Sequence, residues 1–269
     1  MTITNSLDQA AVVSREEWLT ARKDLLAAEK ELTRARDALS ARRRRLPWVK
    51  VEKEYVFDTP GGKKYLADLF DGRSQLIVYH FMWRREYGEG CVGCSFLADH
   101  VDGANTHLAR HDVTFVAIPR ATVTEFEGFY KRMGWRFNWA SSYNSDFGFD
   151  YHVSFTQDDL ARGEIFYNYQ LTPASIEELP GMSVFYKDAA GDIFHTYSCY
   201  GRGNEEVLGA YMYLDITPKG RNENGPHHSM ADWVRHHDKY DAGGFVDATG
   251  AYIAPTRAET SCGCGKGRA

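Results

Sequence analysis

The chain has 269 residues, of which 43% are apolar and 26% charged, and these proportions exclude a disordered or fibrous protein. Its 37 acidic residues outnumber its 32 basic ones, and the resulting net charge of -5 disfavours a protein that binds nucleic acid by charge alone. The longest apolar stretches, such as residues 76–79, are too short to span a membrane, and Arg15, Glu16 and Glu17 interrupt any signal-peptide pattern, so we expect no membrane attachment and a cytoplasmic location.

A long helix is predicted from about Ser14 to about Arg44. Ser14, followed three residues later by Glu17, is a capping-box pattern that marks the helix start. Large apolar residues recur every seven positions, with alanine three positions after each of the first three; they are Trp18, Leu25, Leu32 and Leu39. A heptad stripe of this kind is typical of helices that pack closely against another helix. It favours either a homodimerising arm or a helix that lies across its own domain.

Strand and helix patterns alternate after Pro47, which ends this helix. Leu76–Met82 is apolar on both sides of the strand alternation, which predicts a strand buried on both faces of an α/β sheet. The other predicted elements are a strand-like segment at Val49–Phe57, a helix at Ser95–Arg110, a strand at Val113–Ile118, a helix at Thr122–Met133, a hairpin of Met182–Tyr186 with Asp192–Tyr197, and a helix at Asn204–Leu214. This order predicts an α/β protein with a thioredoxin-like fold, in which helices flank a central mixed sheet.

The same patterns divide the chain into three predicted parts. Residues 1–46 form the N-terminal helical arm, and residues 47–218 form the thioredoxin-like domain, with an insertion around 138–180. Residues 219–269 form an extension rich in Gly, Pro and His, with one short helix predicted at Met230–Tyr240 and an irregular tail.

The main chemical motif is Cys91-Val92-Gly93-Cys94, which lies between a buried strand and a helix. A cysteine at a helix start meets unpaired N–H groups and the positive end of the helix dipole, and both stabilise its thiolate. A second cysteine three residues later lies one turn on, close enough to resolve a mixed disulfide. The context favours redox chemistry, and half of a metal site or a pair of buried structural thiols are the alternatives.

The segments Leu76–Trp83 and Gly90–His100 resemble a bacterial thioredoxin-like family, a group of domains of unknown function described as predicted dithiol–disulfide oxidoreductases. The likeness also includes the N-terminal helix and residues 113–117, 133–137, 183–186, 213–218 and 232–235, so that it covers roughly 15–240. The resemblance implies a thioredoxin-type sheet with both cysteines at its active edge. It does not imply a known substrate.

The motif also resembles peroxiredoxins in outline. In that alignment Cys94 takes the place of the peroxide-reactive thiol, and Cys91 takes the place of the threonine that precedes it in those enzymes. Glu86 and Tyr87 stand where the peroxiredoxin proline is expected. A thiol peroxidase is therefore a weaker alternative.

Two residues are predicted to support the thiols by their position in the sequence. Arg120 follows the predicted strand 113–118 at its C-terminal end, where ligand sites of α/β proteins assemble, and a guanidinium there would stabilise a thiolate. His80 lies in the strand before the motif, where it would exchange protons with a thiol. The alternatives are a surface arginine and a core histidine bonded to the backbone.

Cys262 and Cys264 flank Gly263 near the C-terminus. This tail is predicted to be one of three things: a tethered dithiol that exchanges with Cys91 and Cys94, a clamp that completes a zinc or copper site with them, or an unstructured end.

Together these observations predict a thiol–disulfide oxidoreductase that acts on a disulfide-containing or thiol substrate. Cys91 attacks and Cys94 releases the product. No dinucleotide- or phosphate-binding motif is present in the sequence, so no cofactor is expected.

Overall fold

A six-stranded mixed sheet forms the centre of the protein, whose computed structural model describes residues 10–255. The strands run in the order β1-β12-β11-β4-β7-β8, with bounds Val49–Lys50, Ile193–Tyr200, Gly181–Lys187, Gln75–His80, Val113–Ala117 and Asn138–Trp139. β4 and β7 are parallel, whereas β11 is antiparallel to both β4 and β12. The parallel strands β4 and β7 are joined by a helical crossover, and the antiparallel hairpin β11–β12 lies on the other side of β4. This is the thioredoxin-like arrangement. The predicted fold is confirmed.

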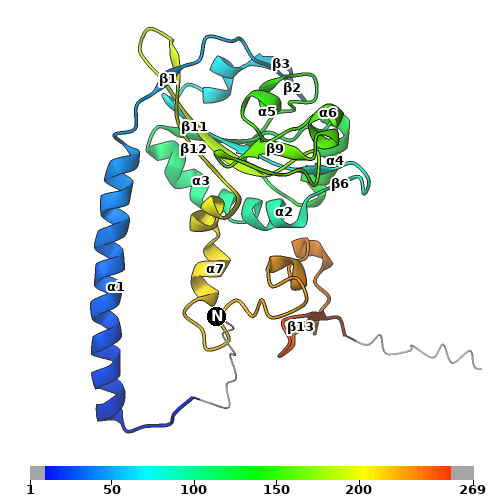
Figure 1. Cartoon of the computed structure of the whole chain (residues 1–269). Helices are drawn as coiled ribbons and strands as arrows, with labels where there is room; N and C mark the ends of the chain where they lie inside the picture. The colour runs from blue at the N-terminus through cyan, green and yellow to red at the C-terminus, as the bar shows by residue number, and fades with distance from the viewer. Residues whose placement is uncertain (1–9, 256–269) are drawn as a thin grey trace, which may run out of the picture.

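Two apolar clusters cover the two faces of this sheet. One contains side chains from α2 (Val92–Ala98), α3 (Val101–Arg110), α4 (Val123–Arg132) and α7 (Gly209–Leu214). The other contains side chains from the β2–β3 hairpin (Val56–Thr59 and Gly62–Tyr65), the 3₁₀ helix η2 (Leu66–Phe70) and α5 (Phe147–Asp150). Figure 1 shows α2, α3 and α7 on one side of the sheet and α5 with β2–β3 on the other.

β4 is buried on both faces, as its sequence predicts. Tyr79 belongs to the cluster beneath α2, whereas Leu76 and Val78 belong to the cluster beneath α5. Successive side chains of a strand point to opposite faces, so this alternation follows directly from the strand geometry. It also decides which residues of β4 face the cysteine motif.

Four predicted elements differ from the structure in their bounds. The predicted strand 49–57 is divided between β1 and β2, which belong to different sheets. The predicted helix 95–110 is two helices, α2 and α3, and the break lies at His100, whose ring is bonded to the Phe96 carbonyl and to the Ala210 N–H. The bond to Ala210 joins residues 110 positions apart and holds the chain where local propensity favours one continuous helix.

The predicted helix 204–214 is the 3₁₀ helix η3 (Gly201–Val207) followed by the short α7. The predicted helix 230–240 is two 3₁₀ turns, η4 (Met230–Asp232) and η5 (His237–Lys239). Both segments bond to other parts of the chain: Arg43 pairs with Glu206, and His236 bonds to Gly90. These side-chain contacts hold both segments in conformations that interrupt a continuous α-helix.

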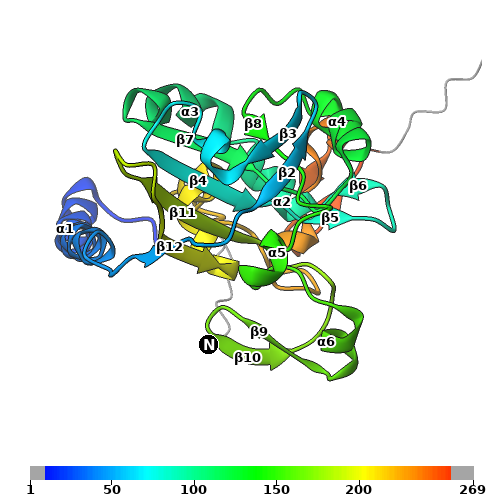
Figure 2. The same cartoon turned by 90° about the horizontal axis from the view of Figure 1, so that it is seen from above.

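The insertion begins with β8 of the central sheet and with α5, which packs on one face of that sheet, and the rest of it stands apart at one side. It contains α5, α6 (Gln157–Ala161) and a two-stranded hairpin of β9 (Glu164–Tyr167) and β10 (Gln170–Pro173). Figure 2 shows this hairpin apart from the central sheet. Two further small hairpins are β5 (Trp83–Arg84) with β6 (Glu89–Gly90), and β13 (Phe245–Val246) with β14 (Tyr252–Ile253).

The N-terminal helix α1 extends from Arg15 to Arg43, and Ser14 and Glu17 form the predicted capping box. It is the longest helix among residues 10–255 and is strongly charged. Within that described range, no helix has the length and apolar character that crossing a bilayer requires.

Thr122→Ala is expected to destabilise the protein by about 1 kcal/mol. Thr122 Oγ1 accepts the Glu125 N–H at the start of α4, and the Glu125 carboxylate accepts the Thr122 N–H in return. Urea denaturation followed by circular dichroism measures the loss, and Thr122→Ser, which keeps the hydroxyl, should retain most of the stability. An alanine variant as stable as the parent would show that this cap contributes nothing.

Candidate active site at the Cys91–Cys94 motif

The β5–β6 hairpin places Cys91 at the start of α2. Trp83 pairs with Gly90 in the hairpin, and the Cys91 N–H donates to the Met82 carbonyl at 3.0 Å. Cys91 is the N-cap of α2, and its carbonyl accepts the Ser95 N–H at 2.9 Å. The chain therefore leaves a sharp hairpin and enters a helix at the residue that carries the first thiol.

The Cys91 thiol lies in surroundings that favour its anion. Its pKa falls to about 6, first because the Cys94 thiol donates a hydrogen bond to it, and further because the backbone N–H groups of Gly93 and Cys94 do so and Arg84 lies nearby. Burial opposes this shift, since Cys91 is partly covered. The hydrogen bonds outweigh the loss of solvation, so a large share of Cys91 is thiolate at neutral pH.

Cys94 has the opposite properties. Its side chain is buried, with an exposed fraction of 2%, in the apolar cluster under α2. This burial raises its pKa well above the usual range, and the neighbouring Cys91 raises it further, although the Met82 N–H donates to its sulfur at 3.5 Å. The pair thus consists of a partly accessible thiolate and a covered, protonated thiol one helical turn on.

Gly90 is required by the packing around the motif. A methyl group at Gly90 would come within 2.6 Å of ring carbons of Phe81 and Phe129. Real Cβ contacts are never so short, and both rings belong to the buried cluster. Gly90 therefore lets the loop before Cys91 pack directly on the core.

The C-terminal extension contacts the same loop, which the sequence does not indicate. His236 Nε2 bonds to the Gly90 carbonyl at 2.9 Å, and Lys239 pairs with Glu89 at 2.8 Å. A methyl group at Gly93 would lie 2.9 Å from the Met230 sulfur, so Met230 sits beside the motif itself. The extension from Met230 to Lys239 thus covers part of the motif.

Arg120 follows β7 (Val113–Ala117), as the sequence predicts, but its side chain packs on an aromatic ring of the insertion. Its guanidinium packs over the Phe149 ring at 4.7 Å, and its carbonyl accepts a hydrogen bond from Arg85 at 2.7 Å. The cation whose charge lowers the Cys91 pKa is Arg84, from the β5–β6 hairpin. The role predicted for Arg120 is better matched by this nearer arginine.

His80 faces the other side of the sheet from the cysteines. It stacks on Phe147 and Tyr151 in the cluster beneath α5, and its Nε2 bonds to Ser183 Oγ at 2.8 Å. Burial lowers the pKa of His80 to about 3, so the ring stays neutral. Because Tyr79 points toward Cys94, the next residue of the strand must point away. This geometry is that of a core histidine, the alternative considered, although its ring bonds to the Ser183 side chain and not to the backbone.

Glu178 is a candidate site residue that sequence reasoning misses. It is buried, and its carboxylate accepts the Trp83 N–H at 2.9 Å. Burial raises the pKa of Glu178 to about 7, although that hydrogen bond and the nearby Arg120 and Arg85 oppose the rise. The only signal in the sequence is its position directly before the β11–β12 hairpin.

A cleft of about 280 Å³ lies next to the β5–β6 hairpin that leads into the motif, and neither cysteine lines it. One wall comes from the residues 82–86 that lead into the cysteine loop, and the other comes from Leu160 and residues 175–178 of the insertion. Arg84 and Glu178 both line it. The cleft therefore joins the group that stabilises the Cys91 thiolate to a buried carboxyl.

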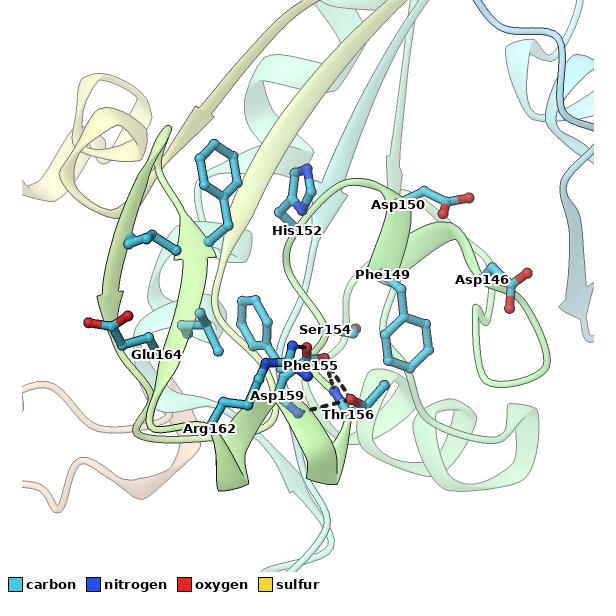
Figure 3. A pocket seen from close by; sticks show the side chains of 13 residues that line it. Asp146, Phe149, Asp150, His152, Ser154, Phe155, Thr156, Asp159, Arg162 and Glu164 are labelled. Carbon is cyan, nitrogen blue, oxygen red and sulfur yellow. Dashed lines mark hydrogen bonds and ion pairs between the residues drawn. The ribbon is translucent and has the colours of Figure 1, made fainter.

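A larger cavity, about 850 Å³, lies in the insertion. Figure 3 shows its carboxylates and phenylalanines, and several of its polar groups bond to one another, as Asp159 does with Thr156 and Arg162. Asp146 and Asp150 also pair with Lys53. A choice of site by cavity volume alone would therefore select the insertion and not the cysteine motif.

The predicted metal site is not assembled within the part of the chain that the structure describes. Residues 10–255 contain no group of three or more His, Cys, Asp or Glu side chains arranged to hold a metal ion. Cys262 and Cys264 lie outside the described residues. A site that these two residues complete therefore stays a prediction.

The alkylation rate of Cys91 by iodoacetamide is expected to rise with pH through a midpoint near 6, because only the thiolate reacts. Cys94→Ala should move this midpoint upward, since it removes the hydrogen bond that stabilises the anion most. Peptide-resolved mass spectrometry measures the rates, with Cys199→Ser as the control. A midpoint near 8.5, the value of an ordinary thiol, would contradict the site described above.

Glu178→Gln is expected to be more stable than the parent protein above about pH 7. A pKa raised from 4.5 to about 7 means that the folded state holds the proton more tightly, so the parent loses stability as the pH rises through this range. The full difference is about 3 kcal/mol, and it vanishes at pH 4. Urea denaturation at several pH values measures it, with Glu177→Gln as the control. A pH-independent difference would contradict burial of an uncompensated carboxyl.

Several solved structures show a distant similarity to the chain. Xanthomonas campestris peroxiredoxin Q matches at 10% identity and a TM-score of 0.41, over 62% of this chain and 96% of that one. Peroxidoxin BcpB from Mycobacterium tuberculosis matches at 13% and 0.38, over 63% and 97%. A putative thiol:disulfide interchange protein DsbE from Chlorobium tepidum matches at 12% and 0.35, over 64% and 99%. Such low scores carry no conclusion about function.

No curated protein matches the chain significantly. One family model does, and it spans residues 7–240, which include the N-terminal helix, the central sheet, the cysteine motif and η5 of the extension. The chain therefore belongs to the family described as bacterial protein of unknown function (DUF899).

Proposed function

We propose that this protein is a thiol–disulfide oxidoreductase that uses Cys91 and Cys94 as its redox pair. The observation that carries the proposal is the asymmetry of the two thiols. Cys91 is partly accessible and its pKa is lowered to about 6, whereas Cys94 is buried and its pKa is raised. A nucleophile and a resolving thiol require these two different states.

In the first step, the Cys91 thiolate attacks one sulfur of a substrate disulfide. An S–S bond forms between Cys91 and that sulfur, the substrate S–S bond breaks, and the departing thiolate takes a proton from solvent. The N–H groups of Gly93 and Cys94 stabilise the thiolate before the attack. The same N–H groups stabilise the Cys91 thiolate when the reverse reaction releases it.

In the second step, Cys94 gives its proton to solvent and attacks the Cys91 sulfur. The mixed disulfide breaks, a disulfide forms between Cys91 and Cys94, and the second substrate sulfur leaves as a thiolate that takes a proton from solvent. Once Cys91 is bound to substrate, its negative charge is gone, so one cause of the raised Cys94 pKa disappears. The substrate gains two electrons, and an external dithiol must return them to the pair.

The cleft beside the motif is where we place the substrate. Its walls carry apolar surface from Met82 and Ile176 and charged groups of both signs, including Arg84 and Glu178. Its volume of about 280 Å³ suits a small disulfide or one disulfide-bearing side-chain pair of a larger molecule. We place the reaction in the cytoplasm, where other dithiols keep such a pair reduced.

The burial of Cys94 disfavours the peroxidase alternative in which Cys94 attacks. An attacking thiol must be ionised and reachable, and Cys94 is covered and protonated. The same geometry suits the resolving role, because attack on Cys91 needs no access to solvent.

Cys91→Ser is expected to reduce the rate of insulin disulfide reduction, with dithiothreitol as electron donor, to the uncatalysed rate. Cys94→Ser should accumulate a mixed disulfide between Cys91 and the substrate, because the thiol that resolves it is missing. Absorbance and intact-mass measurements follow the two effects. Cys199→Ser is the matched control, since that partly buried thiol bonds to Asn204 and lies outside the motif.

Wild-type rates in both motif variants would overturn the proposed function. A Cys94→Ser variant whose mixed disulfide forms at a cysteine other than Cys91 would also overturn it. Peptide mapping identifies the cysteine that is bound to the substrate.

A further inference from the structure

Among the described residues, the N-terminal helix α1 forms ion pairs and hydrogen bonds with the body of the protein only through its last residue, Arg43. It spans 29 residues, or about 43 Å at 1.5 Å per residue, and none of its residues is buried. Figures 1 and 2 show it standing beside the body of the protein. Helices in proteins gain most of their stability from packing of an apolar face, so a partner for this helix is expected.

The apolar stripe of α1 is fully available for such a partner. Trp18, Leu25, Leu32 and Leu39 have exposed fractions of 47%, 56%, 56% and 40%. They repeat every seven residues, and the alanines three positions later leave room for close approach of a second backbone. A repeat of seven residues keeps one stripe in contact along the whole of a supercoiled helix pair. The stripe is therefore suited to a helix of the same period.

The charges that flank the stripe are different on its two sides. The position before each of the first three large apolar residues is acidic: Glu17, Asp24 and Glu31. The position four residues after each of the large apolar residues is mostly basic: Arg22, Glu29, Arg36 and Arg43. Acidic and basic flanks of this kind set partner choice and orientation in coiled coils.

These flanks match those of a second copy in one orientation. With two α1 helices parallel, Glu17 faces Arg22 of the second copy, and Glu31 faces its Arg36. Asp24 faces Glu29, but Glu29 is already paired with Arg22 of its own helix at 2.8 Å. An antiparallel pair would set the acidic flank against the same acidic flank, which is unfavourable.

We propose that α1 binds α1 of a second copy of this chain as a parallel, two-stranded coiled coil. Arg43 fixes the end of the helix to the body, through a two-pronged ion pair with Glu206 and a contact over the Tyr197 ring. Both bodies consequently lie at the same end of the coil. This inference is independent of the redox proposal.

The first test replaces the stripe. Leu25→Asp/Leu32→Asp is expected to weaken the dimer at least about a hundredfold, because it places charged side chains where the two leucines would be buried between the helices. Lys23→Asp/Lys30→Asp is the control, because it introduces two aspartates on the outer face of the helix, away from the stripe. This variant should remain dimeric. Sedimentation equilibrium measures the dissociation constants, and thermal unfolding shows that the body stays folded, as expected for such exposed positions.

The second test addresses orientation. Arg36→Glu should weaken the dimer by up to about tenfold, because Glu31 of one copy then faces a carboxylate of the other. Glu31→Arg/Arg36→Glu should restore the parent affinity by exchanging the two charges. A parent chain that is monomeric at micromolar concentration, or a dimer that survives the leucine replacements, would overturn the proposal. Failure of the charge exchange to restore affinity would overturn the parallel orientation.

Discussion

The site depends on one interaction, the hydrogen bonding of the Cys91 sulfur at the first turn of α2. The N–H groups of Gly93 and Cys94 and the thiol of Cys94 all point to this sulfur, and they outweigh the cost of its partial burial. Cys91 is the N-cap of α2, so its sulfur lies beside N–H groups of the first turn that have no partner within the helix. The β5–β6 hairpin and Gly90 matter because they set the residue at which the helix begins.

The thioredoxin-like sheet supplies only part of this arrangement. The insertion contributes Glu178 and one wall of the cleft, and the extension contributes Met230 and His236, which pack on the motif loop. Parts of the chain that lie outside the common fold thus surround the common dithiol position. The physical consequence is that Cys91 is less open to solvent than a thiol at a bare helix start, while the hydrogen bonds keep its pKa low.

Elements with strong local signals were predictable. The capping boxes at Ser14 and Thr122 fix the starts of α1 and α4, because a side chain bonds to a backbone group only three residues away. The β11–β12 hairpin has a short turn between apolar strands, and β4 has an apolar run of strand length. Elements held by distant contacts were wrong in their bounds, as in the predicted helix 95–110, which breaks at His100.

By itself, the sequence determined the α/β order, the long charged helix and the position of Cys91 before a helix, since each follows from local periodicity and capping. Which side chains meet the thiols was decided only by the tertiary structure. Arg84 rather than Arg120 lies near Cys91, His80 points to the opposite face of the sheet, and Glu178 reaches the cleft from a segment far along the chain. The reason is that strand register, sheet face and loop packing fix these contacts, and they join residues about a hundred positions apart that no local pattern relates.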